Sequence, residues 1–318
     1  MHLTTAPTRR RLLWGAGFAA ITIGACTLLA RRFTHTSWPL HRANIGLVAG
    51  AAALYLASFV FRALGWQRLF PADTRPHRAR CLAACGAAAA SGVVLPFRLD
   101  YLVKVGTLRR MPGVKLGLEA IALSIISLGL VDAVAFLPLS ISATATSSSN
   151  FRYPLLLVVL FGVGACTLLV GGQRVARLPL LARRGRLSRF AARAVGSRSN
   201  RLREECVAWG FLLGCWSTRA AGSTLLLAAL GVGFSPNLAL VVLCVSAAAG
   251  LIPVASGGAV ANVSATAGVL LLVGVDRQRA INFGLASGLL LVVTAVAAAL
   301  IGAVASLAPR LRPAATVS

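Results

Sequence analysis

Long apolar segments alternate along this chain with short segments rich in arginine. Each apolar segment is close to the roughly 20 residues that an α-helix needs to cross the hydrocarbon core of a bilayer. The clear apolar segments are Leu12 to Ala30, Ala43 to Phe61, Val114 to Leu139, Pro154 to Gly172, Val207 to Leu230 and Ala280 to Leu307. This pattern predicts an all-α fold, a polytopic bundle of membrane helices.

Two further apolar stretches, Ala79 to Pro96 and Leu238 to Pro253, are rich in small residues and end in an apolar-apolar-Pro corner. If both crossed the membrane, the basic residues of Arg98 to Lys115 would lie opposite those of Arg62 to Arg80, against the positive-inside rule. We therefore expect both stretches to be re-entrant hairpins.

The predicted topology is about six spans plus two re-entrant hairpins in the cell membrane, with the N-terminus and the C-terminus cytoplasmic. Most arginines then lie inside, and the Ser/Thr-rich segment Ser140 to Asn150 forms an outside loop. Arg9 to Arg11 before an apolar run imitate a twin-arginine or lipoprotein signal. The run continues past Cys26, which favours an uncleaved first span.

The two small-residue stretches also resemble each other, since each is followed by a polar region, a Gly-Val pair and a long helix. Entering from opposite sides, they would form an inverted repeat of the kind found in transporters. Chance similarity between Ala/Gly/Leu-rich helices is the alternative. The chain then divides into an N-terminal membrane half (1–172), an arginine-rich linker (173–205) and a C-terminal membrane half (206–318).

Composition supports the membrane interpretation and excludes other classes. Of the residues, 58% are hydrophobic and 12% charged, and the mean hydropathy is +0.82. The net charge of +25 lies between apolar runs rather than on an aromatic-rich polar surface, so nucleic acid is not an expected partner. Seven cysteines in or at the ends of apolar segments, without a C-x-x-C pair or a nearby histidine cluster, predict no metal site.

The linker 173–205 interleaves arginines with Leu, Phe and Val. It is expected either to lie on the membrane as an amphipathic segment that attracts anionic headgroups or to be a merely solvated linker.

No phosphate-binding loop, dinucleotide fingerprint, zinc-protease or nucleophile-elbow motif is present, so no catalytic residues and no cofactor are predicted. Polar residues at membrane depth are functional candidates because they are costly there. Arg219 is expected to bind a lipid phosphate or to form a structural ion pair. Glu119 is expected to face a headgroup cleft, and Asp132, near the outer end of its helix, to cap or pair structurally.

The segments that follow the two proline corners supply the remaining candidate substrate-binding residues. Arg98, Asp100 and Lys104 follow the first corner, although an i, i+4 ion pair between Asp100 and Lys104 is the simpler interpretation. Gly257, Gly258 and Asn262 occupy the matching place in the second half, where glycine permits either close backbone approach to a ligand or a tight turn.

The segment from Leu95 to Asp132, with Pro96, Arg98 and Lys104, resembles the lysylphosphatidylglycerol synthase transmembrane family, also described as flippase-like. Pro253, Gly257 and Gly258 extend the resemblance. Phe97 stands where the family has a corner glycine, and no soluble synthase domain follows, so lipid aminoacylation is not implied.

We expect a translocator of a polar-headed lipid, such as a modified phospholipid or a polyprenyl-linked intermediate. The alternative is a non-transporting scaffold that binds anionic lipid or a membrane glycosyltransferase partner. A membrane enzyme acting on lipid-linked substrates ranks third, because catalytic pairs are missing.

Overall fold

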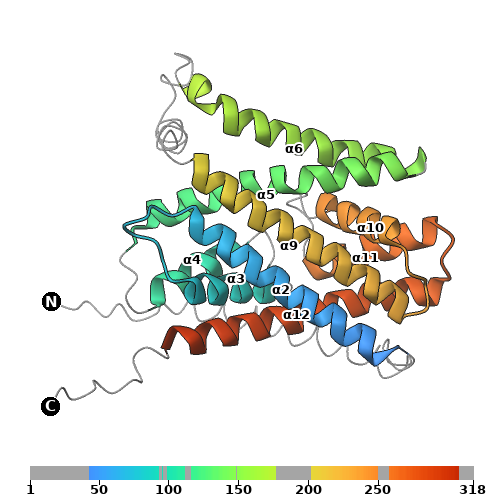
Figure 1. Ribbon diagram of the computed structural model, residues 1–318. Coiled ribbons are helices and arrows are strands. Elements are labelled where there is room, and N and C mark those ends of the chain that lie inside the picture. The colour runs from blue at the N-terminus through green and yellow to red at the C-terminus, as the bar shows by residue number, and fades with distance from the viewer. Residues whose placement is uncertain are drawn as a thin grey trace, which may run out of the picture. The chain divides into compact units, whose positions relative to one another are not determined.

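The computed structural model describes residues 43–92, 95, 99–111, 116–147, 149–176, 202–249 and 258–307, and within these ranges regular structure is entirely helical. The helices are α2 (Ile45–Arg68), α3 (Arg78–Gly92), α4 (Asp100–Arg110), α5 (Leu118–Thr146), α6 (Ser149–Ala176), α9 (Leu202–Ala229), α10 (Pro236–Ala249), α11 (Gly258–Leu272) and α12 (Arg277–Leu307) (Figure 1). The predicted all-α class is confirmed. The predicted span Leu12 to Ala30 and most of the linker 173–205 lie outside the described residues.

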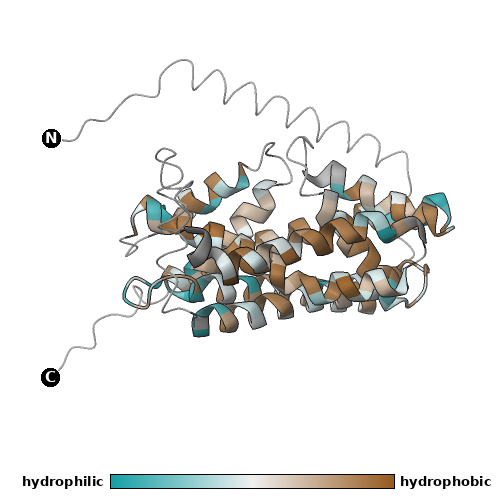
Figure 2. Cartoon of the chain, turned by 90° about the horizontal axis from the view of Figure 1, so that it is seen from above, coloured by the Kyte–Doolittle hydropathy of each residue, from teal (hydrophilic) through white to brown (hydrophobic). Residues whose placement is uncertain are grey.

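Among the described residues, four helices are long and apolar enough to cross a membrane: Ile45–Arg68, Leu118–Thr146, Phe151–Gly171 and Arg277–Leu307. Figure 2 shows these helices apolar over much of their length, with hydrophilic residues mainly near helix ends and in connections. Helix α9 has 28 residues and is also long enough, but it is more polar than these four. The chain is therefore a membrane-embedded helical protein.

Two predicted boundaries are wrong. Helix α2 continues through Arg62 to Arg68, so Arg62 is not the start of a loop. Helix α5 continues to Thr146 through the predicted Ser/Thr-rich loop. There the Ser140 hydroxyl donates to the Leu137 carbonyl (2.8 Å) and the Thr144 hydroxyl to the Ser140 carbonyl (2.7 Å), which lets these polar side chains remain in a helix.

Contacts between helix ends define two ends of the bundle. At the first, which we call the basic end, Glu204 at the start of α9 pairs with Arg68 at the end of α2 (3.4 Å) and with Arg75 (3.1 Å). At the opposite end, the Asn44 amide before α2 donates to the Ala229 carbonyl of α9 (3.2 Å). The Arg279 guanidinium of α12 donates to the Gly231 carbonyl there (3.0 Å).

The Glu204 ion pairs are partly exposed to solvent. Partial burial disfavours the charged carboxylate, but Arg75 and Arg68 outweigh it, and the pKa of Glu204 lies below its ordinary value. Exposed pairs of this kind contribute little to stability. Their structural use is to hold the end of α2, the following loop and the start of α9 together.

The short helices form two hairpins, but with other limits than predicted. The stretches Ala79 to Pro96 and Leu238 to Pro253 were expected to enter and leave by themselves, whereas each contributes one described helix, α3 or α10, and α4 and α11 pack back against these. Helix α3 begins near the basic end, and α4 packs back against it, with Asp100 at the start of α4 beside Gly92 at the end of α3. Helices α10 and α11 also pack together, and the Ser246 and Thr266 hydroxyls are hydrogen-bonded at 2.9 Å. The start of α10, which follows the end of α9, and the end of α11, which precedes the start of α12, lie at the opposite end of the bundle. None of the four exceeds 15 residues, about 22 Å of helix, which is less than the roughly 30 Å hydrocarbon core.

Helix α3 packs against α12 with almost no side chain between the two backbones. A Cβ atom placed on Gly86 would lie 2.5 Å from both the Ala295 carbonyl oxygen and the Ala299 amide nitrogen. Gly302 of α12 makes an equally close approach to the backbone of Ala79 and Ala83. In lipid, where apolar burial does not drive helix association, such small residues permit the van der Waals contact that does.

We predict that Gly86→Ala destabilises the folded protein by about 1 to 3 kcal/mol, because a backbone must move to admit the methyl group. Gly129→Ala in α5, where an added Cβ meets nothing within 4 Å, is the matched control. It should be neutral or slightly stabilising, as alanine is the better helix former. Thermal unfolding in detergent micelles measures both, and equal melting temperatures for the two variants would contradict the close packing.

Candidate functional site

Helices α2 and α9 run antiparallel and make the most extensive helix pair among the described residues. Small residues bring them close, since Gly65 faces Leu212 and Gly222 faces Tyr55. Polar and aromatic side chains from four helices line this contact, and we call them the polar seam. They are Tyr55, Ser58, Arg62 and Trp66 of α2, Lys104 of α4, Ser124 and Asp132 of α5, and Trp216, Arg219 and Ser223 of α9.

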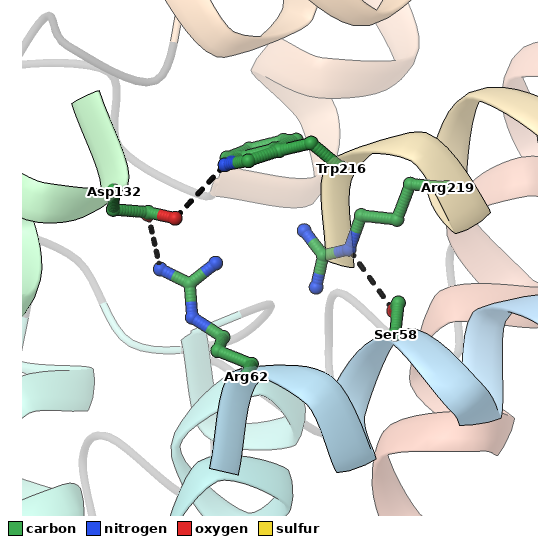
Figure 3. Close-up of polar contacts among 5 residues, drawn as sticks. All are labelled: Ser58, Arg62, Asp132, Trp216 and Arg219. Atoms are coloured by element: carbon green, nitrogen blue, oxygen red, sulfur yellow. Dashed lines mark hydrogen bonds and ion pairs between the residues drawn. The ribbon is translucent and has the colours of Figure 1, made fainter. Parts of the chain in front are cut away.

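Asp132 is the centre of the polar seam (Figure 3). Its Oδ2 accepts a hydrogen bond from the Arg62 guanidinium at 2.6 Å, and its Oδ1 accepts one from the Trp216 indole Nε1 at 2.8 Å. The side chains of Arg62 and Asp132 are 23% and 13% exposed. One carboxylate therefore joins α2, α5 and α9 through charge-assisted contacts, which are stronger than neutral hydrogen bonds.

Arg219 lies beside this centre without a carboxylate partner. Its Nε donates to the Ser58 hydroxyl at 3.2 Å, and its guanidinium carbon lies 5.3 Å from the Trp216 ring centroid and 5.5 Å from that of Phe59. No salt bridge to Arg219 forms among the described residues, so its predicted structural ion pair is absent there. In the view of Figure 3, Arg219 and Arg62 both lie below the Trp216 ring. The charge of Arg219 is stabilised by aromatic rings and one hydroxyl.

Lys104 is a second cation that forms no salt bridge with a carboxylate among the described residues. Lys104 is only 5% exposed, and its Nζ lies 4.1 Å from the Trp66 ring centroid. The Trp66 indole in turn donates to the Ser124 hydroxyl at 3.0 Å. The predicted Asp100–Lys104 ion pair does not form in the part of the chain that the structure describes.

The polar seam extends along the bundle rather than forming a compact cluster. From Trp66, near the basic end, to Tyr55, which is hydrogen-bonded to Ser223 at 2.9 Å, is 11 residues of α2, or about 16 Å. Lys104 lies at the basic-end side, and Arg219 lies further in, beyond the Arg62–Asp132 pair. A polar path with cations at successive depths thus follows the interior of the bundle.

A complete account of the acidic residues shows how positive the seam is. The chain has seven Asp and Glu residues, and the structure describes every one of them. The six acidic residues other than Asp132 lie in a loop or at helix starts: Asp73 in an exposed loop, Asp100 at the start of α4, Glu119 at the start of α5, Glu204 and Glu205 at the start of α9, and Asp276 capping α12. Among the described residues Asp132 is the only carboxylate of the seam, which also contains the three basic side chains of Arg62, Lys104 and Arg219. The charge of the seam is therefore about two positive units in excess.

The structure brings together only part of the predicted site. Of the predicted residues, Lys104 and Arg219 belong to the polar seam. Glu119 is exposed in the first turn of α5 rather than deeper in the helix, because α5 begins at Leu118. Asn262 is half-buried in α11, and among the described residues no polar contact links it to the seam.

The remaining predicted site residues are not joined to the seam either. Asp100 begins α4, where its carboxylate favours the helix N-terminus. Gly258 begins α11. Arg98 and Gly257 lie outside the described residues.

Sequence reasoning missed Arg62, Trp66 and Trp216 and misplaced Asp132, which lies in the middle of α5 and not near its outer end. The prediction that Asp132 pairs structurally is correct. One signal was present: on α2 the polar and aromatic residues Tyr55, Ser58, Arg62 and Trp66 recur at intervals of three and four, which places them on one helix face.

Within the described residues no group of three or more His, Cys, Asp or Glu side chains is placed to hold a metal ion. Comparisons of the chain with protein-family models, with curated proteins and with solved structures found no match.

We predict strong coupling between Arg62 and Asp132 in a double-mutant cycle. Arg62→Gln or Asp132→Asn alone leaves its partly buried partner uncompensated and should cost up to about 3 kcal/mol of folding free energy. The double variant should cost less than the sum of the two, by at least about 1 kcal/mol. Unfolding in detergent measures the cycle, and additive losses would show that the two side chains act independently.

Proposed function

We propose that this protein translocates lipids with an anionic phosphate headgroup across the cell membrane. The observation that carries the proposal is the excess positive charge of the polar seam. A charged side chain at the centre of a membrane helix costs about 3 kcal/mol, so unpaired cations there are expected to serve a ligand. Arg219, in the interior of α9, is such a cation, and Lys104, buried nearer the basic end, is a second cation without a salt bridge in the described residues. Both are held against aromatic rings.

Phosphate is the ligand group that best suits these residues. A guanidinium binds phosphate oxygens through parallel hydrogen bonds, and an ammonium binds phosphate as a point charge. The cations lie at successive depths along α2 and α9, so a headgroup moving along the seam would meet each in turn. The lipid tails would remain in the hydrocarbon, where the outer faces of α6 and α12 carry exposed apolar side chains.

We further propose about six spans plus two re-entrant hairpins, α3–α4 and α10–α11, with both chain termini cytoplasmic. The hairpins enter from opposite ends of the bundle, which supports an inverted repeat. Their shortness supports re-entry instead of crossing. The arginines near the basic end, including Arg68, Arg75, Arg109 and Arg110, favour a cytoplasmic location of that end.

Purified protein in liposomes that carry headgroup-labelled phosphatidylglycerol tests the proposal. Wild-type protein should accelerate exchange between leaflets above empty vesicles. Arg219→Gln should reduce the rate about tenfold or more, because a charge-assisted contact to phosphate is lost while the side chain can still donate to Ser58. Arg152→Gln, which removes an exposed arginine of α6, is the matched control and should exchange like wild type.

Two results would contradict the proposal. Exchange by a folded Arg219→Gln variant at the wild-type rate would remove Arg219 from the transport path. Failure of wild-type protein to exchange phospholipids or a polyprenyl-linked phosphate above empty vesicles would replace translocation with the non-transporting scaffold.

A further inference from the structure

Asp132 has the contacts that a bound phosphate oxygen would make. Both of its carboxylate oxygens are engaged by donors from other helices, Arg62 at 2.6 Å and the Trp216 indole at 2.8 Å. A cationic guanidinium and a neutral N–H converging on one oxyanion is a common arrangement for anion recognition. Here the anion comes from the protein itself.

The seam around Asp132 attracts anions more strongly than one carboxylate can satisfy. Arg62, Lys104 and Arg219 are three basic side chains against the single carboxylate of Asp132. No other Asp or Glu of the chain pairs with these cations in the described residues. An incoming anion would therefore meet two cations without a carboxylate, Lys104 and Arg219. Between them along the seam lies Arg62, which is already bound by Asp132.

We infer that Asp132 is an internal surrogate for the ligand's phosphate: it occupies Arg62 and Trp216 in the empty protein, and the phosphate headgroup of a lipid displaces it from Arg62. This inference rests on the proposed function, because it takes a phosphate headgroup as the ligand of the seam. It adds that Asp132 competes with the ligand. The competition keeps binding weak enough for the headgroup to leave again.

The central consequence is opposite to that of losing an ordinary structural residue. Asp132→Asn removes the competing charge but keeps the size of the side chain, so phosphate should bind more tightly although the empty protein is less stable. A headgroup that binds more tightly leaves more slowly, so leaflet exchange should fall. If Asp132 only held the helices together, the same substitution would weaken binding along with the fold.

The test is isothermal titration calorimetry of the full-length protein in detergent with dihexanoyl phosphatidylglycerol. We expect Asp132→Asn to bind about tenfold more tightly than wild type, the gain from no longer breaking a charge-assisted hydrogen bond. Glu204→Gln is the matched control, because it removes an ion-paired carboxylate outside the seam, and it should bind like wild type. Dihexanoylglycerol, which lacks phosphate, should bind neither protein, and glycerol phosphate reports whether the headgroup suffices without the lipid tails.

Asp132→Asn is expected to be unstable when empty, and this supplies a second readout. If it does not fold in plain detergent, phosphatidylglycerol added during solubilisation should restore monodisperse protein, because phosphate replaces the missing carboxylate. The same amount of dihexanoylglycerol should not.

The outcomes separate the inference from the proposed function. Wild-type binding with equal or weaker binding by Asp132→Asn, or no rescue by phosphatidylglycerol, would overturn the inference while leaving translocation standing. Absence of binding to both wild-type protein and Asp132→Asn would overturn both. Tighter binding by Asp132→Asn without leaflet exchange by wild type would support the surrogate role and overturn translocation alone.

Discussion

The described bundle depends on one carboxylate placed among three cations. Asp132 binds Arg62 of α2 and Trp216 of α9 from the middle of α5, and so joins three of the four helices that line the polar seam. Without it, three positive charges would face one another in a medium where hydration cannot compensate them. The chain has only seven acidic residues, so few substitutes exist. Small residues supply the other main contribution to packing. Glycine and alanine allow α2 to approach α9, and α3 to approach α12, closely enough for van der Waals contact.

This arrangement links the fold to the proposed function. Polar contacts help to fix how membrane helices pair, but an unpaired charge does not stabilise a membrane bundle. The charges of Lys104 and Arg219 are therefore not explained by a role in folding. Their aromatic neighbours Trp66 and Trp216 lower the cost of the charge without neutralising it. In the proposed mechanism an anionic headgroup neutralises Lys104 and Arg219, and Asp132 binds Arg62 while no headgroup is present.

Much of the fold, but less of the site, could be predicted from the sequence. Apolar runs of span length predicted α2, α5, α6, α9 and α12. The small-residue stretches were expected to turn back on themselves, but each forms one helix, α3 or α10, and the packed-back helices α4 and α11 were not predicted. Helix ends were harder, since Ser140 and Thr144 satisfy their hydroxyls within α5 and so do not end it. Arg62 was assigned to a loop because charge normally marks the end of a span. Its partner lies 70 residues away, and neither local pattern nor composition reports such a pairing.

The most direct test of the central claim, that Lys104 and Arg219 hold an anionic lipid headgroup, is to identify the lipid that remains bound after gentle extraction from native membranes. Native mass spectrometry of wild-type protein should show a retained phosphate-bearing lipid, and a folded Lys104→Met/Arg219→Gln double variant should have lost it. Equal lipid retention by both proteins, or retention of uncharged lipid only, would contradict the account.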